Sequence, residues 1–214
     1  MIEILLKIFM ENLFKLKDIN LLSNIDIKKR LKSLAMLDAI LCPEWEYRYF
    51  SFNNSWDKDE SMASMRDGEG NEYFILFKNE NIIGKVFEKK HPLSDLQREE
   101  IFKKIPKTLN SFFSEVAFSL EDTTFIFWKE RKDEKWFSLP SNKEFSYLGY
   151  IYIAKLYITW AKEYYEVDFD EKTIQEIFNY SPLTEARVQK LNKTLCLDDL
   201  KEDIKEIGYC PDQA

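Results

Sequence analysis

A run of alternating aromatic, β-branched and polar residues from Trp45 to Leu93 constrains the fold of this 214-residue chain most strongly. Alternation with a period of two is typical of β-strands. The acidic glycine turn from Asp67 to Asn71 divides the run, and short turns favour antiparallel neighbours. The sequence therefore predicts an antiparallel meander over residues 45–88.

The meander is expected to hold four strands, over 45–52, 61–67, 72–78 and 82–87. A loop at Asn53, Asn54 and Asp57 is expected to separate the first two strands. In the third strand Tyr73, Ile75 and Phe77 share one face, and Phe74 and Leu76 share the other. Because both faces are apolar, this strand is predicted to be central and buried on both sides.

Helical patterns flank and interrupt the strands. Ser94 and Gln97 have the spacing of a capping box, at the start of a helix that is expected to end near Ile105. Asp26 is a candidate N-cap for the helix expected over 27–41, and Asp170 is a candidate N-cap for the helix expected over 171–179. The expected helices cover 2–16, 27–41, 94–105, a stretch after Pro106, 145–165 as the longest, 171–179, 184–193 and 198–207 with a stop at Gly208.

The order of these patterns predicts an α+β fold. The antiparallel sheet should contain about four to six strands, from the meander 45–88 and a hairpin over 123–139, packed against N-terminal and C-terminal helices. The length suits one domain, and 45% hydrophobic residues can fill its core. We expect a single domain over 1–214, with N-terminal helices in 1–42, a sheet-rich region in 43–140 and a helical region in 141–214.

The cysteines and the apolar segments bear on where the protein resides. Cys42, Cys196 and Cys210 are odd in number and lack metal-ligand spacing, which fits a reducing compartment. Charged residues interrupt the apolar stretch 1–16 at helical spacing, so it is predicted to be an amphipathic helix and not a signal peptide. No run of eighteen uncharged apolar residues occurs. We expect a cytoplasmic protein that does not enter the membrane.

The charge of the chain bears on its partners. The net charge is −7, and residues 141–214 contribute −5 of it, with nine Lys or Arg against fourteen Asp or Glu. Such a region repels nucleic acid, so a nucleic-acid partner is not expected. An acidic surface favours encounter with a basic protein, although it also serves solubility alone.

One cluster of oxygen ligands is a candidate metal site. Asp67, Glu69, Asn71 and Glu72 lie within six residues and could hold a hard cation. A calcium loop counted from Asp67 needs glycine at its sixth position and glutamate at its twelfth, where this chain has Glu72 and Lys78. The segment is therefore predicted to be a polar turn, and no metal is expected.

Motifs for nucleotide or nucleophilic chemistry are absent from the sequence. The five glycines form neither the dinucleotide-binding nor the P-loop spacing, so no cofactor is expected. His91 is the only histidine, and no catalytic residue is assigned. The alternative to a binding protein is a hydrolase or transferase whose site assembles around His91 with Glu72 and Glu88.

The aromatic segment that begins the meander is the best candidate for a binding site. It combines Trp, Tyr and Arg, the residue types that are enriched in interface hot spots. Aromatic residues in a sheet also serve as core, so packing is the competing interpretation. The candidate binding residues are Trp45, Tyr47, Arg48, Tyr49 and Trp56, together with Asp67 and Glu69 of the acidic turn.

Residues 47–53 and 62–77 carry a resemblance. The stretches YRYFSFN and MASMRDGEGNEYFILF resemble a block in uncharacterised bacterial proteins of the α+β kind, some of which accompany polymorphic toxins as immunity proteins. The resemblance implies a bacterial protein-binding protein and brings no catalytic residue. The sequence thus predicts a non-enzymatic cytosolic protein, plausible as an immunity-type protein that masks a basic toxin domain with an acidic and aromatic surface.

Overall fold

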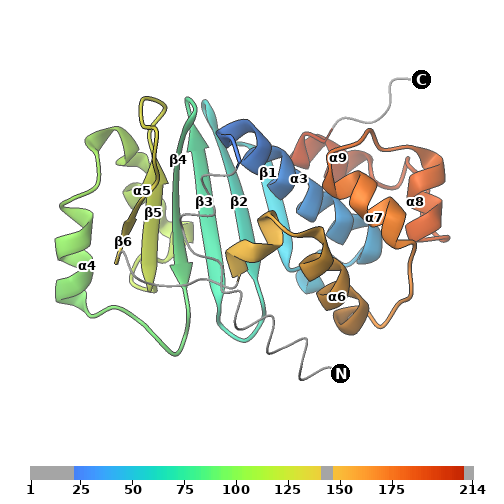
Figure 1. Ribbon diagram of the computed structural model, residues 1–214, viewed down its shortest axis with the longest axis horizontal. Helices are drawn as coiled ribbons and strands as arrows, with labels where there is room; N and C mark the ends of the chain where they lie inside the picture. The colour runs from blue at the N-terminus through green and yellow to red at the C-terminus, as the bar shows by residue number, and fades with distance from the viewer. Residues whose placement is uncertain (1–21, 141–146, 210–214) are drawn as a thin grey trace.

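A computed structural model describes residues 22–140 and 147–209. The helix expected over 2–16 lies outside the described residues. The described chain forms a six-stranded antiparallel sheet in the order β1-β2-β3-β4-β5-β6, with helices packed on it (Figure 1). The prediction of an α+β fold with an antiparallel sheet of four to six strands is confirmed.

Each strand pairs with the next strand along the chain, because short turns join most of them. The longer connection between β4 and β5 carries helices that cover one face of the sheet. The strands are β1 Phe50–Asp57, β2 Glu60–Arg66, β3 Glu72–Lys78, β4 Asn81–Phe87, β5 Phe125–Lys129 and β6 Phe137–Leu139.

The first strand does not begin where the sequence predicts it. Residues Trp45–Tyr47 form a 3-10 helix, η1, and β1 begins only at Phe50. The predicted loop at Asn53 and Asn54 is part of β1, where the pairing register shifts between Asn53 and Asp57. Such a bulge accommodates residues that fit a regular strand poorly. The predicted strand is therefore confirmed over residues 50–52, while its start at residue 45 and the loop at 53–57 were wrong.

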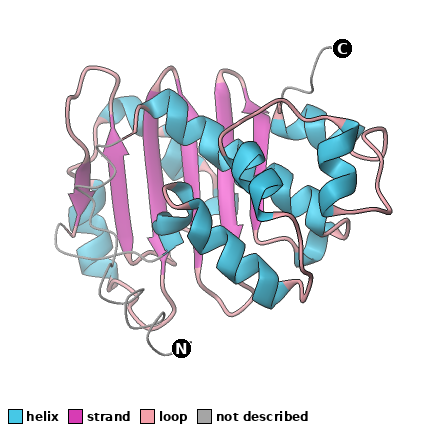
Figure 2. Ribbon diagram, turned by 45° about the vertical axis from the view of Figure 1, so that its right-hand side comes forward, coloured by secondary structure: helices cyan, strands magenta, loops and turns pink. Residues whose placement is uncertain are grey.

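Helices cover both faces of the sheet. One face carries α3 Asn24–Leu41, η4 Tyr147–Ile151, α6 Ala154–Tyr164, α7 Glu171–Phe178, α8 Glu185–Leu191 and α9 Lys201–Ile207. The other carries α4 Asp95–Phe102, η2 Lys107–Leu109, α5 Ser111–Ser114 and η3 Val116–Phe118. Figure 2 shows helices of the first face lying across the strands. We call these the first face and the second face.

The central strand β3 joins the two cores. Tyr73, Ile75 and Phe77 pack with the helices of the first face, and Phe74 and Leu76 pack with those of the second. The predicted alternation of this strand is confirmed. Burial on both sides explains why the strand has almost no polar residue between its ends.

Several predicted helix ends are confirmed. The capping box of Ser94 and Gln97 opens α4, Asp170 caps α7, and Gly208 ends α9 in the left-handed conformation with φ of 64°. The N-cap of α3 is Ser23, which accepts a hydrogen bond from the Asp26 amide. Asp26 lies in the first turn, so its prediction as N-cap was wrong.

Two long predicted helices are broken. The expected helix over 145–165 separates into η4 and α6, and Ile153 between them is extended, with φ of −125° and ψ of 100°. The Gly149 carbonyl accepts from the amides of Tyr152 and Ile153 and closes the first piece. The stretch after Pro106 likewise forms η2, α5 and η3. Among the described helices α3, with 18 residues, is the longest.

Candidate functional site

The turn that follows α3 presents four consecutive side chains to solvent. Trp45 is 60% exposed and Tyr47 is 57% exposed, and Glu44 and Glu46 are exposed beside them. Carboxylates and aromatic rings therefore alternate along the turn. We call Glu44–Tyr47 the aromatic turn. Its two rings contribute nothing to either core, so packing does not explain why they are present.

Arg48 holds the aromatic turn from beneath. Its Nε donates to the Cys42 carbonyl at 2.7 Å and its Nη2 donates to the Pro43 carbonyl at 2.8 Å. The guanidinium also forms an ion pair with Asp203 of α9, and only 8% of the Arg48 side chain is exposed. These partners occupy both edges of the guanidinium. Arg48, expected as a binding residue, therefore lies under the surface and fixes the turn to α9.

Helix α6 supports the turn from its other side. The Tyr164 hydroxyl donates to the Tyr47 carbonyl at 3.1 Å, and the Tyr164 ring is 40% exposed. The Tyr49 ring lies between Trp160 and Tyr164, with centroid distances of 4.6 Å to each. Aromatic groups from two distant segments thus form one continuous cluster.

Carboxylates approach this cluster from the β2–β3 turn and from α6. The pKa of Tyr49 is raised to about 12, first by burial and then by Asp67 and Glu69 among its neighbours. Burial also raises the pKa of Tyr150 to about 12, with contributions from Asp67 and Glu163. We call the aromatic turn, Tyr49, Trp160, Tyr164, Glu69 and Glu163 the acidic–aromatic surface.

The turn between β2 and β3 is built by its own polar groups. Asp67 Oδ1 accepts from the amides of Glu69 at 2.8 Å and Asn71 at 2.9 Å, while Gly68 and Gly70 adopt positive φ. Glu69 is exposed at the tip. Within the described residues no group of three His, Cys, Asp or Glu side chains is placed to hold a metal ion.

Trp56 lies apart from the other candidate residues. Its Nε1 donates to Glu115 at 3.2 Å, and its ring stacks on Phe118 at 6.1 Å, beside the core of the second face. Of the seven predicted residues, Tyr49 lies near Asp67 and Glu69, the Tyr47 carbonyl binds Tyr164 beside Tyr49, and Trp45 lies beside Arg48 and Asp203. Sequence reasoning missed Glu163 and Tyr164 as members, and the four-residue spacing of Trp160 and Tyr164 on a helix was the only local signal.

No catalytic group gathers around His91. Its side chain is exposed and makes no hydrogen bond or ion pair within the described part of the chain. Glu72 is held by Lys85 and, at 3.8 Å, by Arg66. The Glu88 amide donates to Thr124 Oγ1, and the Thr124 hydroxyl donates to the Glu88 carbonyl. The Glu72 carboxylate thus serves other contacts, and Glu88 meets His91 through the backbone, where the His91 amide donates to the Glu88 carbonyl at 2.8 Å.

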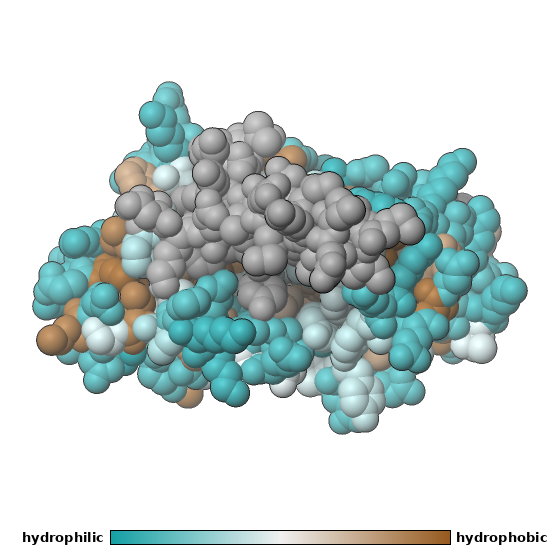
Figure 3. All heavy atoms as spheres, turned by 60° about the horizontal axis from the view of Figure 1, so that its bottom comes forward, coloured by the Kyte–Doolittle hydropathy of each residue, from teal (hydrophilic) through white to brown (hydrophobic). Residues whose placement is uncertain are grey.

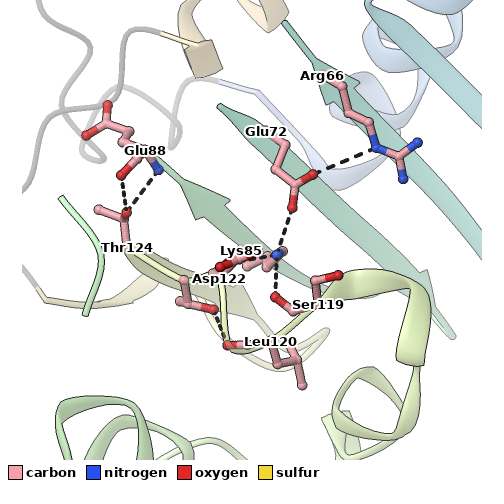
Figure 4. Close-up of polar contacts among 9 residues, drawn as sticks. Arg66, Glu72, Lys85, Glu88, Ser119, Leu120, Asp122 and Thr124 are labelled. Atoms are coloured by element: carbon pink, nitrogen blue, oxygen red, sulfur yellow. Dashed lines mark hydrogen bonds and ion pairs between the residues drawn. The ribbon is translucent and has the colours of Figure 1, made fainter. Parts of the chain in front are cut away.

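The second face buries a lysine (Figure 4). The Lys85 side chain is fully buried and its Nζ donates to Glu72 at 2.9 Å, to the Ser119 carbonyl at 2.8 Å and to the Asp122 carbonyl at 2.7 Å. Burial lowers the pKa of Lys85, and Glu72 opposes this shift. Three acceptors satisfy the three N–H bonds of an ammonium group. Lys85 therefore fixes the 119–122 loop to the sheet and is not available to a ligand.

The first face buries a carboxylate directly under the acidic–aromatic surface. Asp38 Oδ2 accepts from the amides of Tyr49 at 2.9 Å and Phe50 at 2.8 Å, and its Oδ1 accepts from the Tyr157 hydroxyl at 2.7 Å. Burial raises the pKa of Asp38 to about 7, and these hydrogen bonds oppose the shift. Asp38 thus joins α3 and the start of β1 to α6, the helix that carries Trp160 and Tyr164 of the surface.

The hollow that borders the acidic–aromatic surface is small, whereas an open one of about 460 Å³ is lined by Asn81, Thr108, Glu130, Arg131 and Lys132. A hollow of about 20 Å³ lies between Trp45, Arg48 and Asp203, which is room for about one water molecule. Figure 3 shows the lower end of the molecule, where hydrophilic residues cover most of the described surface and apolar groups gather at the two ends. The acidic–aromatic surface is therefore suited to contact with a macromolecule and not to enclosure of a small one.

Comparison with known proteins finds no match: no family model matches the chain, and neither does any curated protein or solved structure. The described helices include none that is long and apolar enough to cross a membrane.

Proposed function

We propose that this chain is a non-enzymatic protein that binds a basic partner protein through its acidic–aromatic surface. The observation that carries the proposal is the aromatic turn, where Trp45 and Tyr47 are more than half exposed while Arg48 and Tyr164 hold the backbone in place. Exposed aromatic residues on a rigid support supply contact area at low cost in conformational entropy.

Charge defines the partner. Glu44, Glu46, Glu69 and Glu163 are exposed, and none of them forms an ion pair within the described residues. These carboxylates can therefore form ion pairs with cationic side chains of a partner. The net charge of −7 adds long-range attraction to a basic protein and accelerates its association.

An immunity-type role in a bacterial cytoplasm is the form of this proposal that the resemblance of residues 47–53 and 62–77 supports. These residues include most of β3 and parts of β1 and β2, the strands beside which the surface is built. The partner would then be a basic toxin domain whose active surface is masked. A hydrolase or transferase site around His91 gains no support, because that side chain makes no hydrogen bond or ion pair within the described residues.

The proposal is tested by capturing the partner and mapping its contact. The full chain is used as bait in host cells with chemical crosslinking, and any retained protein is purified and titrated by calorimetry. We expect a basic protein whose affinity falls at least tenfold for Trp45→Ala/Tyr47→Ala, because truncation of aromatic hot spots typically costs more than about 1.4 kcal/mol.

Leu96→Ala is the matched control. Leu96 is 76% exposed, but it lies on α4 of the second face. Its substitution should leave the affinity unchanged. A partner that binds both variants as well as it binds the original chain would overturn the proposed surface, and an acidic partner would overturn the charge argument.

A further inference from the structure

We propose that the aromatic turn is a receptor for an arginine side chain of the partner. This inference rests on the proposed function and adds the chemical group that the surface recognises. The guanidinium would stack on Trp45 or Tyr47 while its N–H edge donates to Glu44 or Glu46. No part of the established fold needs these four side chains, since none of them belongs to either core.

The alternation of rings and carboxylates matches the two kinds of surface on a guanidinium. Its flat face is attracted to the π-electrons of an aromatic ring, and its edge pairs with a carboxylate through two parallel hydrogen bonds. An ammonium group is a compact, strongly hydrated point charge and lacks this planar geometry. Side chains three residues apart share one side of a 3-10 turn, so the Glu44 carboxylate lies on the side of the Tyr47 ring, and the turn favours arginine over lysine.

The rigidity of the turn strengthens the inference. Arg48 binds the carbonyls of Cys42 and Pro43 on one side, and the Tyr164 hydroxyl binds the carbonyl of Tyr47 on the other. The backbone between these contacts is therefore fixed before a ligand arrives. Preorganisation of this kind lowers the entropic cost of binding.

Charge also decides between possible occupants. A second copy of this chain would bring another net charge of −7 and the same four unpaired carboxylates to the surface. Like charges placed opposite one another oppose association. A basic segment with arginine on its surface is complementary in both charge and shape, and it is the occupant to which we commit.

The test compares two peptides that differ only in their cation. Acetylated and amidated (Gly-Arg)₃ and (Gly-Lys)₃ are titrated into the ¹⁵N-labelled full chain, and the indole N–H signal of Trp45, assigned with Trp45→Phe, is followed by NMR. We expect the arginine peptide to shift this signal and to bind about two- to fivefold more tightly than the lysine peptide. Glu44→Gln/Glu46→Gln should abolish the preference.

Two further variants distinguish the side chains that contact the peptide from Arg48, which holds the aromatic turn in place. Arg48→Lys keeps the charge but cannot reach all of its acceptors, so it should weaken the arginine peptide several-fold and shift backbone signals around the aromatic turn. Leu96→Ala should change neither peptide. Arg48 is thus tested as a positioning residue, with backbone shifts as the readout that distinguishes this role.

The outcomes distinguish this inference from the proposed function. Equal binding of the two peptides, with partner capture still lost in Trp45→Ala/Tyr47→Ala, would overturn the arginine receptor and leave the binding surface in place. If that variant keeps both peptide binding and partner capture, the arginine receptor and the proposed binding surface are both overturned. Concentration-dependent self-association that is removed by the same variant would assign the surface to a second copy of the chain and would also overturn the inference.

Discussion

The two faces of the sheet each bury a charged side chain, and they stabilise it in different ways. On the second face Lys85 has a carboxylate partner and two carbonyl acceptors, so its charge is compensated where it lies. On the first face Asp38 receives only neutral donors, two amides and a tyrosine hydroxyl. Burial shifts the pKa of each group toward its neutral form, downward for Lys85, where Glu72 opposes the shift, and upward to about 7 for Asp38. Asp38 on the first face is therefore the group that should make stability depend on pH near neutrality.

The largest effect should come from placing a new charge in each core. Ile75→Asp and Leu76→Asp put an unpaired carboxylate on the first and the second face of the same central strand. Each should cost several kcal/mol, which is comparable to the whole stability of a domain. Circular dichroism melts should show both variants unfolded at room temperature. A folded Leu76→Asp would mean that the second face is less well packed than the structure indicates.

Removal of the buried ammonium should have the next largest effect. Lys85→Met leaves Glu72 without its closest cation and leaves two carbonyls unpaired, so we expect a loss of about 3–5 kcal/mol in the free energy of unfolding. Urea denaturation measures it. Lys103→Met breaks an exposed pair with Glu100, 3.2 Å apart, and should change little. Equal effects of the two variants would contradict a structural role for Lys85.

The pH dependence of the first face follows from the sign of the shift at Asp38. Its pKa in the folded chain, about 7, lies above that of an ordinary aspartate, about 3.9. The folded state therefore holds the proton more tightly, and this contribution to stability is fully present below about pH 4. It is lost as pH rises through 7, at about 1.4 kcal/mol for each unit of pKa difference.

Asp38→Asn removes this titration while keeping a carbonyl acceptor. The difference in unfolding free energy between the original chain and this variant should change by a few kcal/mol between pH 4 and pH 8 and then level off. Chemical denaturation at a series of pH values gives the curve. Parallel curves would show that Asp38 is charged at every pH tested or is not buried.

The smallest effects should come from the exposed residues. Glu69→Ala and Trp45→Ala remove side chains that project from the acidic–aromatic surface, so each should change the free energy of unfolding by no more than about 0.5 kcal/mol. Thermal melts with and without Ca²⁺ provide the measurement. A strong stabilisation by Ca²⁺ that Glu69→Ala abolishes would show that the 67–71 turn is a cation site after all.

The fold follows from the sequence where the local pattern and the tertiary contacts agree. The alternation in β3 predicted a strand buried on both faces, and the capping residues Ser94, Asp170 and Gly208 marked three helix ends. The aromatic turn has the same alternation and is not a strand. Its backbone is set by Arg48, whose partner Asp203 lies 155 positions away along the chain. A contact of this kind leaves no periodic signal.

In the candidate site, too, the sequence indicated what the local pattern carries and missed what long-range contacts decide. The residue types in Trp45–Tyr49 pointed to an interface, but the sequence could not tell that Arg48 faces inward or that Trp56 lies beside the other core. Tyr164 joins the surface because α6 packs beside the segment that leads into β1.

The strictly sequential order of the strands has a consequence for synthesis on the ribosome. Each strand can pair with its predecessor as soon as it emerges, so the sheet can grow from β1 onward. The outer edge of β1, however, is flanked by α9, which is translated long after β1, and Gly208 at its end lies against Asn54. Until then the nascent chain carries an open strand edge, the kind of feature that recruits other chains. A premature stop before Lys201 should therefore yield an aggregating product, and not merely a less stable one.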